Sequence, residues 1–93
     1  MIQTTSIISY LANLEKINQR QKECLIALKK IQPANNLMLS QFTRLPINCV
    51  CGRMKELRDK KLVRLHHVGA CPISHEQTRF YSIVSYVNDI LVN

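Results

Sequence analysis

The chain has 93 residues, 46% of them hydrophobic and 20% charged, so it is long enough for one small domain and too short for a multidomain enzyme. Thirteen Lys and Arg against six Asp and Glu give a formal net charge of +7, which favours a polyanionic partner, nucleic acid first. No apolar stretch approaches the roughly 20 residues that span a bilayer, and the N-terminus lacks the pattern of a signal peptide. We therefore expect a cytoplasmic protein.

The first half of the chain carries the apolar spacing of helices. Apolar residues recur at steps of three and four over residues 6–17, which predicts an amphipathic N-terminal helix within segment 1–17. Asn18 stands three residues before Gln21, the pattern of a capping box, and predicts a second helix over residues 19–32. Pro33 interrupts the pattern, and two asparagines then offer N-caps for a short helix over residues 37–43.

A fourth helix is predicted from Ile47 to Lys60, after the turn Arg44-Leu45-Pro46. Its expected buried stripe consists of Ile47, Val50, Met54 and Leu57.

Beyond Lys61 the pattern changes to that of strands, over residues 62–68 and 78–84. The connection over residues 69–77 is polar and long, and we expect a ribbon with a mobile tip. Residues 84–93 have apolar positions at helical spacing and are predicted to form a C-terminal helix. The whole chain, 1–93, is then a single α+β domain, mainly α, with a core over 18–83 and extra terminal helices.

A short helix, a three-residue turn and a longer helix form a helix-turn-helix, and a β-ribbon after the second helix gives the order of a winged helix. Several short motifs are also characteristic: Asn35-Asn36, Leu39-Ser40, Leu45-Pro46-Ile47-Asn48-Cys49-Val50, the segment 53–63 (RMKELRDKKLV), and Cys71-Pro72-Ile73-Ser74 followed by Phe80-Tyr81. Over roughly residues 20–83 the chain resembles the winged-helix DNA-binding proteins of small phages and prophages. It is similar, more distantly, to the multiple-antibiotic-resistance regulators. The resemblance implies a sequence-specific double-stranded DNA-binding protein that regulates transcription.

Three residues depart from that family pattern. Arg44, Lys61 and His75 stand where glycines are usual in the turn, after the recognition helix and in the wing. A left-handed backbone is expected at the first two positions, which costs a residue with a side chain about 1 kcal/mol.

Basic residues concentrate where this interpretation needs them, with seven basic and two acidic side chains between Arg44 and Arg64. Helix 47–60 is expected to lie in the major groove, and the wing over 66–80 to contact the phosphate backbone or the minor groove. The candidate DNA-contacting residues are Ser40, Arg44, Asn48, Cys49, Cys51, Gly52, Arg53, Lys55, Arg58, Lys60, Lys61, His75 and Arg79.

Some of these residues have a structural alternative. Gly52 is explained equally by close approach to DNA or by close packing against another protein element. Asn48 can cap its own helix, and Arg53 can brace the domain through its aliphatic stem. In the wing, Arg79 and His75 are preferred to the adjacent His66 and His67, one of which should face inward.

Cysteine and histidine content raises other hypotheses. Without an export signal, the four cysteines (Cys24, Cys49, Cys51 and Cys71) are expected to be reduced thiols, with Cys24 in the core. Cys49 and Cys51 have Cys-x-Cys spacing and would point apart on one helix, so they are not expected to bind one zinc ion together. Cys71 and His75 could supply two zinc ligands, but a structural zinc site is disfavoured. No cofactor is predicted, and a cysteine nucleophile lacks a positioned base, so we do not expect an enzyme.

Two further expectations concern partners. The main rival function is a winged-helix protein-interaction module recruited to replication or transcription machinery. Independently, the apolar terminal segments need a covering surface: they either pack on each other within one chain or pair across a two-fold axis. We favour a homodimer through terminal helices, because two recognition helices about 34 Å apart would read a palindrome.

Overall fold

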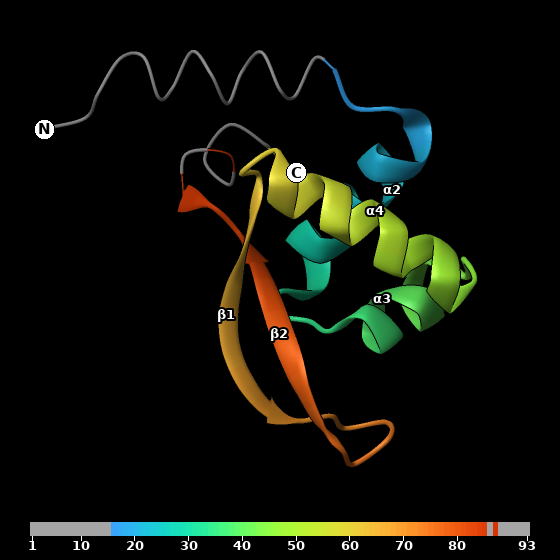
Figure 1. The fold of residues 1–93 in the computed structure, drawn as a ribbon. Helices are drawn as coiled ribbons and strands as arrows, with labels where there is room; N and C mark the ends of the chain where they lie inside the picture. Colours follow the sequence, from blue (N-terminus) through green and yellow to red (C-terminus); the bar gives the residue numbers. More distant parts are fainter. Residues whose placement is uncertain (1–15, 86, 88–93) are drawn as a thin grey trace, which may run out of the picture.

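Three α-helices and a two-stranded antiparallel hairpin make up the part of the chain that the structure describes (Figure 1). The computed structural model describes residues 16–85 and 87. The elements are α2 (Gln19–Ile31), α3 (Asn36–Thr43), α4 (Ile47–Asp59), β1 (Val63–Ala70) and β2 (Gln77–Ile83). The predicted α+β class is confirmed, and this layout is compatible with a winged helix.

The helix starts follow from local capping. Asn18 accepts a hydrogen bond from the Gln21 backbone at 2.9 Å, and the Gln21 side chain accepts one from the Asn18 backbone at 3.0 Å. The predicted capping box is therefore present at the start of α2. Asn35 caps α3 by accepting a hydrogen bond from the backbone of Met38 at 2.8 Å.

The core lies where the three helices meet the proximal end of the hairpin. Val50, Met54 and Leu57 of α4 are fully buried, as the spacing predicted, and Cys24 of α2 is fully buried as well. The prediction for Ile47 was wrong, since this side chain is 40% exposed. Ile47 is the first residue of α4 and lines a cavity, so the core does not cover its side chain.

The hairpin is longer than predicted, and its strands are unequally buried. Strand β2 lies between β1 and Ala34, whose backbone exchanges hydrogen bonds of 2.8 and 3.0 Å with Tyr81. Residues 80–83 of β2 are buried, whereas residues 64–68 of the edge strand β1 are exposed. The Ala34 bridge was not predicted; it comes from the segment between α2 and α3.

The expectation that one of His66 and His67 faces inward was wrong, because both are exposed. The strand register is irregular between Leu65 and His67, so the simple alternation of faces fails there. The His67 ring stacks on Phe80, with centroids 4.6 Å apart, on a part of the hairpin that extends past the helices.

The predicted terminal helices fall largely outside the described residues. Of the helix expected over 6–17, only Lys16 and Ile17 are described, and neither is helical. Of the segment 84–93, the structure describes Val84, Ser85 and Val87. Ser85 and Val87 are helical, and Val87 is fully buried in the core. A dimer through these helices stays a prediction. No helix in the described part of the chain has the length and apolar character needed to cross a membrane.

Candidate nucleic-acid interface

The turn between α3 and α4 sets the angle of α4. Arg44 ends α3 in the left-handed conformation, with φ 64°, and donates its backbone N–H to the Ser40 carbonyl at 2.8 Å. The Ser40 hydroxyl donates to the Leu45 carbonyl at 2.6 Å, so its proton is engaged inside the turn. The Leu45 backbone N–H in turn donates to the Thr43 hydroxyl at 3.2 Å. The predicted contact residue Ser40 thus holds the turn, and the Arg44 side chain stays exposed.

All three positions where a glycine was expected have positive φ: Arg44 at 64°, Lys61 at 65° and His75 at 66°. The left-handed geometry predicted for the first two is confirmed. Lys61 reverses the chain after α4, which allows the fully buried Leu62 to follow at once. At each position the left-handed backbone crowds the side chain, which costs free energy that a glycine would not lose.

The outer face of α4 carries a stripe of polar or small residues, which we call the α4 stripe. It consists of Asn48, Cys51, Gly52 and Lys55. Asn48, Cys51 and Lys55 are exposed, and a Cβ added at Gly52 would meet nothing within 4 Å. Packing against another described element therefore does not explain Gly52. Asn48 is not the cap of α4 either, because the N-cap position is Pro46.

The opposite flank of α4 faces α2 and holds two of the predicted contact residues. Arg53 donates two hydrogen bonds to Glu56, from Nε at 2.7 Å and from Nη2 at 2.8 Å. The Gln21 side chain of α2 also donates to Glu56, at 2.7 Å. Cys49 is half-buried on the same flank, beside Arg53. The structure thus separates Cys49 and Arg53 from the α4 stripe.

Hydrogen bonds among Gln21, Arg53 and Glu56 shift the pKa values of the two ionisable side chains. The hydrogen bonds from Arg53, and then that from Gln21, lower the pKa of Glu56 from 4.5 to about 2. In return, the hydrogen bond to Glu56 raises the pKa of the Arg53 guanidinium. Arg53 was expected either to contact DNA or to brace the domain through its aliphatic stem; the structure shows its guanidinium bound to Glu56 instead.

The Arg58 side chain also makes a contact within the molecule. Its guanidinium lies over the Tyr81 ring of β2, 4.6 Å from the ring centroid, in a cation–π contact that ties α4 to the hairpin. Its Nη1 atom is buried and forms no hydrogen bond with any residue of the described chain. Lys60 is the C-cap of α4 and is half-buried, while the Lys61 side chain is exposed.

The loop of the hairpin is organised around the Cys71 thiol, which is 1% exposed. Its sulfur accepts backbone hydrogen bonds from Ile73 at 3.4 Å and from Ser74 at 3.5 Å. The bond from the Ser74 backbone is the main reason that the pKa of Cys71 is lowered from 9.0 to about 7. The Cys71 and His75 backbones are linked at 2.8 Å, so the connection is shorter and better ordered by hydrogen bonds than the sequence predicted.

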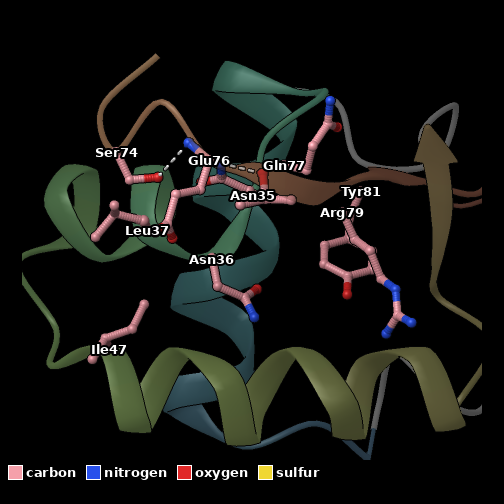
Figure 2. A pocket seen from close by; sticks show the side chains of 10 residues that line it. Asn35, Asn36, Leu37, Ile47, Ser74, Glu76, Gln77, Arg79 and Tyr81 are labelled. Atoms are coloured by element: carbon pink, nitrogen blue, oxygen red, sulfur yellow. Dashed lines mark hydrogen bonds between the residues drawn. The ribbon is translucent and has the colours of Figure 1, made fainter. Parts of the chain in front are cut away.

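A cavity of about 510 Å³ separates α3 and the start of α4 from the hairpin. Figure 2 shows Arg79 and Tyr81 extending from β2 towards α4, with Asn36 between them and Ile47. Asn36, which lines the cavity, also donates a hydrogen bond to the Cys51 sulfur of the α4 stripe at 3.4 Å. The exposed cation Arg79 lines the same cavity as Asn36 and Ile47.

Residues that the sequence analysis did not select also build this region. Asn35 was considered only as a cap, yet its amide donates to the Thr78 hydroxyl of β2 at 3.0 Å. The bond fixes the hairpin relative to α3. Asn36 lines the cavity, and its Oδ1 atom is buried without a hydrogen bond from the described residues. In the sequence, the pair Asn35-Asn36 was a capping signal and part of the family resemblance, and neither residue was expected to contact DNA.

The described residues do not include a group of three or more His, Cys, Asp and Glu side chains placed to hold a metal ion. All four cysteines are free thiols in the structure. Comparison with known proteins adds no further assignment: no family model matches the chain, and no curated protein or solved structure is significantly similar to it.

Proposed function

We propose that this protein is a winged-helix protein that binds double-stranded DNA sequence-specifically, as a phage-type transcriptional regulator does. In this proposal α4 enters the major groove, and the hairpin contacts the phosphate backbone or the minor groove. The observation that carries the proposal is the α4 stripe, where exposed Asn48, Cys51 and Lys55 surround a glycine with open space above it. Such a surface admits the edges of base pairs.

The chemistry of the stripe suits base recognition. An asparagine side chain can form two hydrogen bonds to adenine, and a thiol offers an apolar contact to the methyl group of thymine. Lys55 adds a cation, although it also lies 3.3 Å from Asp59 in an exposed ion pair. We therefore assign sequence reading to Asn48 and Cys51, with Gly52 allowing close approach.

Phosphate contacts are assigned to exposed cations around the stripe, namely Arg44, Lys61 and Arg79. They come from the turn before α4, the end of α4 and the hairpin, so they flank the stripe on different sides. Arg53 is left out of the proposed contacts, because its guanidinium is bound to Glu56. Ser40 and Arg58 are assigned to holding the turn and the hairpin.

The first test is selection from random duplexes, which should enrich one motif that the protein binds more tightly than scrambled DNA. In titrations on that motif, Asn48→Ala should lose about 1–3 kcal/mol of discrimination at one base pair. Arg79→Ala should weaken binding to every duplex and reduce the salt slope by about one unit. Lys22→Ala is the control, because this exposed cation lies on α2, outside the proposed surface.

Failure of the selection would favour the rival function, a protein-interaction module. The observation behind that rival is the exposed apolar surface of the hairpin, where Leu65 is 48% and Val68 is 59% exposed. Binding to duplexes without enrichment and without salt dependence would exclude the DNA-reading role of α4.

A further inference from the structure

A second surface of the molecule lies between α2 and α3, in a groove of about 240 Å³. Ile26 is 41% exposed and Phe42 is 50% exposed there, and both line the groove. Apolar side chains gathered in one concave site are typical of interaction surfaces, unlike single exposed residues. None of the residues that line this groove comes from α4 or the hairpin, so it is separate from the proposed DNA surface.

The charges along the groove have a definite order. Glu23, Ile26, Ala27 and Lys30 follow each other on one face of α2, at helical spacing. The carboxylate and the ammonium are seven residues apart, about 10 Å along the helix axis, with the apolar residues between them. A surface with a negative end, an apolar centre and a positive end complements itself when a second copy is rotated by a two-fold axis.

We propose that the α2–α3 groove binds a second copy of this chain, with the two α2 helices antiparallel, Ile26 and Phe42 at the centre, and Glu23 of each copy facing Lys30 of the other. The proposal does not depend on DNA binding.

Charge balance supports a second copy over other partners. The chain carries +7, so two copies repel each other through most of their surface. The two ionisable residues that line the groove carry opposite charges and sum to zero. An acidic partner would be attracted by Lys30 and repelled by Glu23, whereas a two-fold partner satisfies both.

The local contacts of Glu23 leave it able to pair. It accepts hydrogen bonds from Arg20 at 3.1 Å and Gln19 at 3.4 Å, both exposed and within its own helix. Exposed pairs of this kind contribute little, so a carboxylate can exchange or share them at an interface.

The first experiment is sedimentation equilibrium of the full chain over a range of protein concentrations, at low salt. We expect a reversible dimer, and we expect Phe42→Asp to raise its dissociation constant about tenfold or more, as loss of an aromatic anchor does. Val68→Asp is the matched control, because it places the same charge on an equally exposed apolar residue of the hairpin. Circular dichroism of both variants checks that the fold is retained.

The second experiment tests the antiparallel pairing by charge reversal. Glu23→Lys alone and Lys30→Glu alone should each weaken the dimer, since like charges then face each other across the two-fold axis. An equimolar mixture of these two variants should form heterodimers as tightly as the unmodified protein, because every facing pair is again of opposite charge.

Three results would overturn the proposal. A monomer at all concentrations leaves the groove without a second copy. An unchanged dimer in Phe42→Asp places the interface elsewhere, such as the terminal segments. A mixture of charge variants that associates no better than each variant alone excludes the antiparallel pairing of Glu23 with Lys30.

Discussion

The helical core and the edge strand of the hairpin differ in how deeply their apolar side chains are buried. In the core, Leu28, Leu39 and Leu57 are fully buried, whereas on β1 of the hairpin Leu65 and Val68 are about half exposed. The proximal end of the hairpin belongs to the core, where Val63, Tyr81 and Ile83 are buried. Polar contacts, namely the Ala34 bridge and the Asn35–Thr78 bond, add to this attachment. Burial therefore concentrates in the helices and the proximal end of the hairpin, and residues 64–68 of the edge strand β1 are left exposed, where a partner could contact them.

The largest expected effect distinguishes these two regions directly. Leu57→Ala removes a fully buried side chain and should lower the free energy of unfolding by about 2–5 kcal/mol. Val68→Ala on the exposed strand should change it by less than about 0.5 kcal/mol. Urea denaturation of both variants measures the contrast, and equal losses would mean that the exposed stretch of β1 contributes to stability as much as the core does.

A smaller effect is expected at the link between the two regions. Asn35→Ala removes both the cap of α3 and the hydrogen bond to Thr78, and should cost about 1–2 kcal/mol. Asn36→Ala is the neighbouring control and should cost less, since Asn36 bonds only weakly to the Cys51 sulfur. Comparable losses in thermal unfolding of the two variants would contradict the linking role of Asn35.

The strained turns offer a change in the opposite direction. Arg44→Gly and Lys61→Gly each replace a side chain at positive φ and should stabilise the protein by about 0.5–1 kcal/mol, after the entropy lost by glycine is counted. The same substitution at Lys55, which has an ordinary helical backbone, should destabilise α4 by about 1 kcal/mol. Denaturation midpoints test the signs, and destabilisation by all three would refute the inferred strain.

The smallest effect concerns the pH dependence of the α2–α4 contact. The pKa of Glu56 is about 2 in the folded protein against an ordinary value of 4.5, so its stabilising contribution is present above about 4.5 and lost as pH falls towards 2. Glu56→Gln should flatten the stability profile over that range. Unfolding of both proteins at a series of acidic pH values measures this, and parallel profiles would argue against the Arg53–Glu56 pair.

Much of the fold was predictable from short-range patterns. The capping box of Asn18 and Gln21, the buried spacing of Val50, Met54 and Leu57, and the left-handed turns at Arg44 and Lys61 each depend on residues close together in the chain. Helix and turn geometry follow from such local hydrogen bonds and periodicity. The sequence thus determined which segments are helices and strands, and placed the excess positive charge around α4.

Only the tertiary structure decided which side chains of α4 bind other parts of the molecule and which stay exposed. Arg53 and Asn48 look equally suited to DNA, but Gln21, 35 residues before Glu56, joins Arg53 at that carboxylate. In the same way Asn35 meets Thr78 across 43 residues. Such contacts depend on how the helices and the hairpin pack together, and because burial and hydrogen-bond partners arise at that stage, no local pattern in the sequence contains them.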